Sequence, residues 1–167
     1  MNHNLSEQKQ SLVEKLGIFI ENKDQLAPIA ARILSYIILT GQGGTTFEDL
    51  VTHLCASKST ISTHLNHLQN LNKIVYFTKP GDRKKYFIIN KEIIIQNIDD
   101  MICSWSNQKD LHTEIKSYKE SMNSLKGEQN ALKFDLEFHD NYIKFLNEAT
   151  KSISELRTQI IINHNNL

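Results

Sequence analysis

The sequence has little cysteine, little proline and no long hydrophobic run. Its 167 residues include two cysteines and two prolines. Two thiols are too few for a disulfide framework, which indicates a reducing compartment. No apolar run approaches the roughly 18 residues that a membrane span requires, and the polar start MNHNLSEQKQ lacks the apolar core of a secretory signal. We therefore expect a cytoplasmic protein that is not associated with a membrane.

The sequence also lacks the motifs that most metal sites and many enzymes need. Neither Cys-x-x-Cys nor His-Glu-x-x-His occurs, so the set of His53, His64, His67 and Cys55 is a weak metal candidate. The glycine-rich stretch 41–44 follows no predicted strand, which argues against a phosphate-binding loop. No nucleophile–base pair is evident. We expect a protein that is not an enzyme and has neither metal nor cofactor. Cys55 and Cys103 are expected to be small buried residues.

The sequence has no net charge, but its charges are unevenly distributed along the chain. The chain has 19 basic and 19 acidic residues and is formally neutral. Between residues 57 and 91, seven basic residues accompany a single acid, a net charge of +6, so the rest of the chain carries −6. A neutral protein with one strongly basic segment is suited to binding phosphates through one surface.

Two helical patterns precede the basic segment. Gly17 lies within the first, over residues 5–22, and indicates a close helix crossing. Pro28 suits the first turn of the second, over 26–39, whose nearly continuous apolar surface predicts a central, buried helix. Six apolar residues of the first pattern should share one helix face: Leu5, Leu12, Val13, Leu16, Phe19 and Ile20.

The stretch 46–71 predicts a helix-turn-helix. Thr46 and Asp49 form a capping box for a helix over 47–54. After the Cys55-Ala56 turn, Ser57 should cap a second helix over 58–71, with Ile61, Leu65 and Leu68 facing inward.

This second helix contains no acid and no arginine. Hydroxyl and amide side chains at its start can bond phosphates and base edges, so we interpret it as a DNA recognition helix. An ordinary surface helix is the plainer alternative. Its predicted DNA-contacting residues are Ser57, Lys58, Ser59, Thr60, Ser62, Thr63, His64, Asn66 and His67, of which Ser59, Thr60, Ser62, Thr63 and Asn66 would face the bases.

Two β-rich runs, 74–78 and 86–89, follow the recognition helix. The Pro80-Gly81 turn between them predicts a hairpin, or wing. Its tip should contact the DNA backbone or the minor groove, and Asp82 is expected to hold the guanidinium of Arg83. A solvated tip without a DNA role is the alternative. The predicted wing contacts are Lys79, Asp82, Arg83, Lys84 and Lys85.

From residue 91 to the end the pattern is helical, and Gly127 is a candidate break. Apolar residues repeat at alternating steps of four and three, as in a coiled-coil seam, which favours dimerisation. The seams are Leu111, Ile115, Tyr118, Met122 and Leu125, then Phe138, Tyr142, Phe145, Ala149, Ile153, Leu156 and Ile160.

The predicted fold class is mainly α: a winged helix-turn-helix with a two-stranded β wing and long C-terminal dimerisation helices. Residues 1–25 would form an N-terminal helix on the core or dimer interface, 26–90 the DNA-binding domain, and 91–167 the dimerisation region. We expect a homodimer on a palindromic site in double-stranded DNA. The alternative is a winged-helix adaptor that mediates protein–protein interaction without specific DNA binding.

Residues 12–39, LVEKLGIFIENKDQLAPIAARILSYIIL, and the stretch 47–87 resemble the GbsR-type branch of the MarR-like winged-helix regulators. The SKSTIS helix start and the PGDRKKY wing are the most specific pieces. The resemblance implies a cytoplasmic homodimer on operator DNA, often a repressor that a small-molecule effector releases. Ser57 and Ser59 match the family's helix start, and Asp82-Arg83 match its wing. Thr63 departs from the pattern, because many relatives have a basic residue there.

Overall fold

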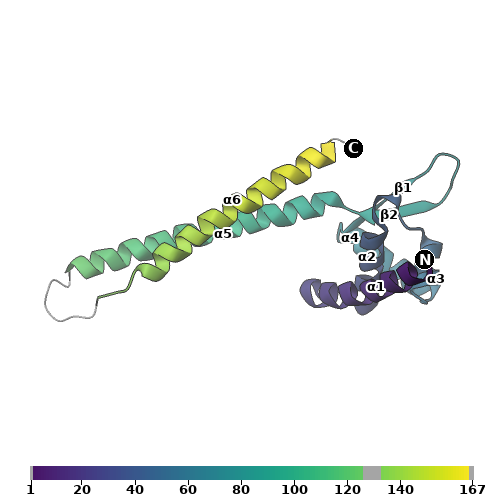
Figure 1. Ribbon diagram of the computed structural model, residues 1–167, viewed down its shortest axis with the longest axis horizontal. Helices are drawn as coiled ribbons and strands as arrows, with labels where there is room; N and C mark the ends of the chain where they lie inside the picture. Colours follow the sequence, from purple (N-terminus) through teal and green to yellow (C-terminus); the bar gives the residue numbers. More distant parts are fainter. Residues whose placement is uncertain (1, 126–132, 166–167) are drawn as a thin grey trace. The chain divides into compact units, whose positions relative to one another are not determined.

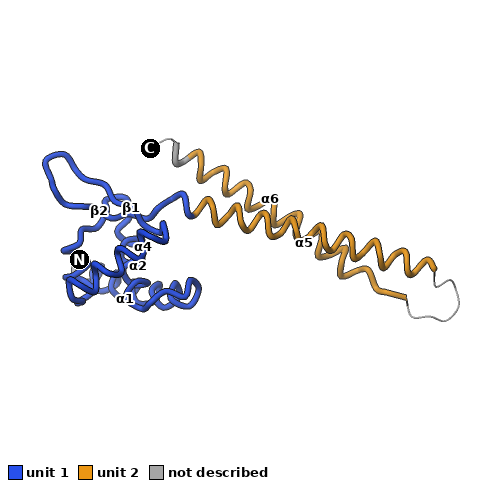
Figure 2. Tube along the Cα trace, turned by 180° about the vertical axis from the view of Figure 1, so that it is seen from behind, with its two compact units in different colours: residues 1–93 blue, residues 94–167 orange. Residues whose placement is uncertain are grey.

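The computed structural model describes residues 2–125 and 133–165 and separates the chain into two units, residues 1–93 and 94–167 (Figure 2). The first unit holds most of the secondary structure, in the order α1 (Asn2–Asp24), α2 (Pro28–Thr40), the short 3-10 helix η1 (Gly41–Gly43), α3 (Phe47–His53), α4 (Lys58–Asn70), β1 (Ile74–Thr78) and β2 (Lys85–Ile89). The second consists of α5 (Lys91–Leu125), except for its first residues, and α6 (Glu137–Asn165) (Figure 1).

Helix α2 forms the centre of the first unit. Pro28 occupies its first turn, as predicted, where the missing N–H has no intrahelical partner. Ala30, Ile33 and Ile37 are at most 1% exposed and belong to a core shared with α3, α4 and both strands. The prediction of a buried central helix is confirmed.

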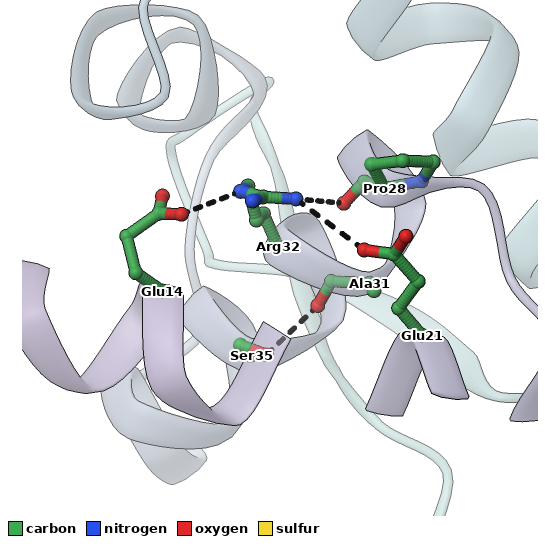
Figure 3. A network of polar contacts seen from close by, with 6 residues as sticks. All are labelled: Glu14, Glu21, Pro28, Ala31, Arg32 and Ser35. Atoms are coloured by element: carbon green, nitrogen blue, oxygen red, sulfur yellow. Dashed lines mark hydrogen bonds and ion pairs between the residues drawn. The ribbon is translucent and has the colours of Figure 1, made fainter. Parts of the chain in front are cut away.

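Helix α1 crosses α2 at Gly17, as the sequence predicted. A Cβ at Gly17 would lie 3.0 Å from Arg32 Cγ, so a larger residue there would require the Arg32 side chain to shift. Arg32 then extends along α1 (Figure 3): Nε donates to Glu14 at 2.8 Å, and Nη1 lies 3.8 Å from Glu21 and donates to the Pro28 carbonyl at 3.0 Å. These partly exposed ion pairs fix the side chain more than they add stability.

The prediction that all apolar residues of α1 share one face is wrong. Val13 and Ile20, four residues before and three after Gly17, are buried because they lie on the side that α2 covers. Leu5, Leu12 and Phe19, spaced seven residues apart, lie on a different side of the helix. They are 63%, 42% and 61% exposed, respectively.

The loop before α3 depends on one glycine. Gly44 has φ 72° and ψ 159°, a region essentially restricted to glycine. A Cβ there would lie 2.8 Å from Tyr86 Cβ. The adjacent Thr45 pairs with Phe87, through Thr45 N–H to Phe87 O at 3.0 Å and Phe87 N–H to Thr45 O at 2.8 Å, which attaches this loop to the wing.

We predict that Gly44→Ala lowers the free energy of unfolding by about 2 kcal/mol or more, since backbone strain alone costs about 1–3 kcal/mol. Gly43→Ala is the matched control, because no atom lies within 4 Å of its added methyl and its φ is not positive. Urea denaturation of both variants measures the difference. Equal midpoints would show that the loop relaxes without cost.

In the second unit, α5 and α6 pack as an antiparallel hairpin. Ile98 and Leu146 are 8% and 1% exposed. Polar contacts also join the helices: Tyr142 Oη donates to Gln108 Oε1 at 2.8 Å, and Lys116 Nζ lies 2.6 Å from Asp140. The candidate break at Gly127 lies outside the described residues.

Only part of the predicted seam of α6 faces α5: Tyr142 contacts Gln108 and the ring of His112, whereas other seam residues are exposed. Phe138, Phe145 and Leu156 are 62%, 54% and 48% exposed. The helix instead packs through the side that carries Leu146, one residue and therefore about 100° further round than Phe145. The heptad pattern was present in the sequence, but the pairing of α5 with α6 leaves much of it uncovered.

His139 is an almost fully buried polar side chain, 4% exposed, in this hairpin. Its Nε2 lies 2.8 Å from Lys119 Nζ and its Nδ1 lies 3.0 Å from His112 Nδ1. Because an ammonium can only donate, Nε2 accepts and Nδ1 carries the ring proton. Burial lowers the pKa of His139, and the charges of Lys119 and His112 lower it further. Lys116 has the same effect, while Asp140 opposes it.

A depressed histidine pKa makes the folded hairpin bind fewer protons than the unfolded chain. The contribution of neutral His139 to stability is therefore complete above about pH 6.5, the pKa of histidine in the unfolded chain, and is lost as the pH falls below that value. We predict that His139→Gln reduces the fall in melting temperature between pH 7 and pH 5.5, because glutamine can still accept from Lys119 but does not titrate. His67→Gln, on exposed α4, is the control. Identical pH dependence in wild type and His139→Gln would contradict the assignment.

Candidate nucleic-acid interface

Helix α4 is held in place by the packing of its buried face against the core and by a cap at its N-terminus. Ile61, Leu65 and Leu68 are at most 3% exposed. Ser57 Oγ accepts the Thr60 N–H at 3.1 Å, which is the predicted N-cap. The sequence therefore determines which face of α4 is inward and leaves the opposite side to solvent.

The outer side of α4 carries two kinds of polar side chain. Some hydroxyls are engaged within the helix: Ser57 Oγ lies 2.9 Å from Ser59 Oγ and 2.8 Å from Thr60 Oγ1, and Thr63 Oγ1 donates to the Ser59 carbonyl at 3.0 Å. In contrast, Ser62 and Asn66 are exposed. They are one turn apart and make no side-chain hydrogen bond to the described residues.

The remaining predicted contacts of α4 surround this pair. Lys58 and His67 are exposed, Thr60 and His64 are half-buried. All nine predicted residues therefore lie on the cap or on the accessible sides of one helix. Ser62 and Asn66 are the two whose hydrogen-bonding groups are most available to a base edge.

The turn between α3 and α4 contains Cys55 in a left-handed conformation with φ 50°. The prediction that this cysteine is buried is wrong: it is exposed, as is Cys103 on α5. The tight reversal points the Cys55 side chain away from the core, and its Sγ lies 3.8 Å from the Thr52 carbonyl.

The wing is an antiparallel hairpin whose register pairs Phe77 with Tyr86 and Thr78 with Lys85. The Asp82 N–H donates to the Lys79 carbonyl at 3.0 Å, and Gly81 has φ 76°. Proline at the second and glycine at the third position are typical of a type II turn, so the predicted Pro-Gly turn chemistry is confirmed.

Asp82 does not hold Arg83, contrary to expectation. Its carboxylate accepts the Lys84 N–H at 2.9 Å and the Tyr86 hydroxyl at 2.7 Å. These bonds lower the pKa of Asp82 and raise the pKa of Tyr86. Asp82 therefore shapes the tip of the wing, and Arg83 is left exposed.

Two wing lysines lie over tyrosine rings of the same hairpin. Lys79 Nζ is 3.8 Å from the centre of the Tyr86 ring, and Lys85 Nζ is 4.1 Å from that of Tyr76. Sequence reasoning did not single out these tyrosines, although tyrosines on both strands of a lysine-rich hairpin were a usable signal. The cation–π contacts hold the two ammonium groups near the hairpin without neutralising them.

The basic charge of the wing is only partly offset by nearby acids, because a single carboxylate, that of Asp82, accompanies four basic side chains at the hairpin. Among the described residues, Lys79, Arg83, Lys84 and Lys85 have no carboxylate within ion-pair distance. Lys73 differs, since its Nζ lies 2.7 Å from Asp24 and anchors the end of α1. The net positive charge of the basic segment is therefore concentrated at the hairpin.

Within 2–125 and 133–165, no three His, Cys, Asp or Glu side chains are grouped so that they could hold a metal ion. Over the same ranges, no helix is long and apolar enough to cross a bilayer.

The arrangement of α2, α3, α4 and the β1–β2 hairpin defines a winged helix-turn-helix. No protein-family model and no curated protein matches the sequence. The fold is similar to a solved structure described as a transcriptional regulator, with TM-score 0.48 and 19% identity over 91% of this chain and 97% of that one.

Two further solved structures resemble the fold more distantly. One is a variant of MepR from S. aureus bound to an oligodeoxyribonucleotide, with TM-score 0.41 and 19% identity over 73% of this chain and 92% of the other. The other is a transcriptional regulator from Thermotoga maritima, with TM-score 0.40 and 19% identity over 73% and 96%. All these TM-scores are below one half, so they support no conclusion about function, which must come from the residues of this chain.

Proposed function

We propose that the protein is a DNA-binding transcriptional regulator of the MarR-like winged-helix class. One observation carries this proposal: the acid-free outer side of α4 and a hairpin with a net positive charge belong to the same folded unit. In such modules the helix enters the major groove and the flanking element contacts the backbone. A surface helix with only a solubilising role would normally carry exposed acids and lysines, which α4 lacks beyond Lys58.

The two elements contribute differently to binding. Without arginine, α4 cannot make a bidentate guanine contact, so its readout rests on hydroxyl and amide groups. Asn66 suits adenine, and Ser62 can bond either partner of a base pair. The wing cations, above all Arg83 and Lys84 at its tip, would supply much of the phosphate affinity.

We further propose that the regulator works as a homodimer on a palindromic operator. Apolar residues at heptad spacing remain exposed on both helices of the hairpin, in the pattern that a second copy could cover. On α5 they are Leu111, Tyr118 and Leu125, and on α6 they are Phe138 and Phe145. Two α4 helices would then reach successive major grooves about one helical turn apart. A repressor released by an effector fits the GbsR-type resemblance of the sequence.

Arg83→Ala tests the role of the wing. Loss of one phosphate contact should weaken binding to every duplex sequence and reduce the slope of log affinity against log salt by about 0.9. Lys151→Ala, which removes an exposed charge from α6, should leave the slope unchanged. Fluorescence anisotropy on a random duplex at several salt concentrations measures both. A wild-type slope for Arg83→Ala would remove this residue from the interface.

A further inference from the structure

The tip of the wing is longer than a hairpin turn requires. The last pair of the strand ladder is Thr78 with Lys85, so residues 79–84 lie outside the paired strands. A backbone hydrogen bond from the Asp82 N–H to the Lys79 carbonyl, at 3.0 Å, closes the turn itself. Because a loop of two residues is enough to join antiparallel strands, the additional residues need side-chain contacts if the tip is to keep one shape.

Tyr86 on β2 supplies such a contact. Its hydroxyl donates to the Asp82 carboxylate at 2.7 Å, and the same carboxylate accepts the Lys84 N–H at 2.9 Å. Hydrogen bonds to an ionised carboxylate are stronger than those between neutral groups. The residues on both sides of Arg83 are therefore connected to the strand through one tyrosine hydroxyl.

The ring of Tyr86 is itself firmly packed. Phe77 on β1 stacks on it, with ring centres 5.5 Å apart and planes at 24°. Gly44, in the loop before α3, leaves the room that the ring needs, since a Cβ there would lie 2.8 Å from Tyr86 Cβ and 3.1 Å from Phe77 Cε1. The same loop is bridged to β2 through Thr45. Tyr86 is thus anchored to the body of the first unit as well as to the hairpin.

Tyr76 on β1 offers a natural comparison within the same wing. It is 45% exposed, and Lys85 Nζ lies 4.1 Å from the centre of its ring. Among the described residues, none forms a hydrogen bond with its hydroxyl. Both tyrosines therefore carry a lysine on their rings, but only the hydroxyl of Tyr86 is connected to the tip.

We propose that Tyr86 is a positioning residue for the wing: through Asp82 it holds the tip in one shape, in which Arg83 and Lys84 are ready to meet the DNA backbone. Contacts that are ordered before binding give higher affinity, because the loop does not have to lose its freedom when the complex forms. A loose tip would carry the same charges and would reach the same phosphates at a greater entropic cost. The ordering of the tip stands on the contacts alone, and its effect on DNA affinity rests on the proposed function.

Trypsin measures the order of the tip without DNA, because cleavage after Arg83 or Lys84 requires the local backbone to open. In the full-length chain, Tyr86→Phe keeps the ring and removes the hydroxyl. We expect cleavage at the tip, followed by mass spectrometry, to become about tenfold faster, as the loss of a hydrogen bond to a charged group predicts. Cleavage after Lys23 on α1 reports general unfolding and should not change. Tyr76→Phe should be cleaved at the wild-type rate, and wild-type cleavage of Tyr86→Phe would overturn the proposal.

A double-mutant cycle on a random DNA duplex tests the consequence for binding. Tyr86→Phe should weaken affinity about tenfold with an unchanged salt slope, because the number of phosphates contacted stays the same. In an Arg83→Ala, Lys84→Ala background, the same substitution should change affinity by less than about twofold, since the groups that it positions are gone. An equal loss in both backgrounds would show an effect unrelated to the tip and would overturn the proposal. A wild type without salt-dependent affinity would refute the proposed function instead, and the trypsin experiment would still decide whether Tyr86 orders the tip.

Discussion

Replacing Phe138 and Phe145 together with glutamate should convert the proposed homodimer into a monomer. Both side chains are more than half exposed, so the α5–α6 hairpin itself should remain folded. They are one heptad apart, and Tyr142 stacks on each of them, with ring centres at 5.7 and 6.1 Å. Two carboxylates at the two ends of this aromatic row would have to be buried if a second copy covered it, at a cost that no partner charge offsets.

Loss of the dimer should weaken binding to a two-half-site operator by about 100-fold or more, since linked sites gain about 10²–10⁴ in avidity. Binding to a single half-site should change little. Sedimentation velocity and anisotropy on the two duplexes measure these effects. Asn147→Glu with Thr158→Glu is the matched control, because both residues are exposed on another side of α6 and the change in net charge is the same. A dimeric Phe138→Glu, Phe145→Glu variant would show that the interface lies elsewhere.

The second large effect is expected on α4. Ser62→Glu with Asn66→Glu should reduce affinity for any duplex by about 100-fold or more, because like charges brought into contact cost several kcal/mol. The two side chains are exposed and make no side-chain hydrogen bond to the described residues, so thermal stability should be nearly unchanged.

The same control pair on α6 separates this effect from a general change in net charge. Anisotropy on specific and random duplexes gives the affinities, and circular dichroism gives the melting temperature. If the α4 variant bound DNA as the wild type does, this side of α4 would not face the duplex. The basic wing would then need a different explanation.

Features governed by neighbouring residues were predictable from the sequence. The Thr46–Asp49 capping box, the Ser57 cap and the Pro80-Gly81 turn each depend on backbone groups within about four residues. The inward stripe of α4 followed from helical periodicity alone. These local rules determined the winged helix-turn-helix and therefore most of the candidate interface.

Features that depend on distant partners were not predictable in the same way. Which side of α1 is buried depends on where α2 crosses it, and which side of α6 packs depends on the register of the hairpin. The role of Asp82 depended on Tyr86 across the wing, and the exposure of Cys55 on the left-handed turn that contains it. In each case several apolar or polar partners were chemically acceptable, and only the three-dimensional arrangement selects one.

The most direct test of DNA binding is the salt dependence of wild-type affinity for a random DNA duplex. A regulator that places its wing and the start of α4 on phosphates should bind with an affinity that falls steeply as salt rises. The log–log slope should correspond to several phosphates at about 0.9 each. A winged-helix adaptor for another protein would show no affinity that depends on salt in this way, and that result would contradict the proposed function.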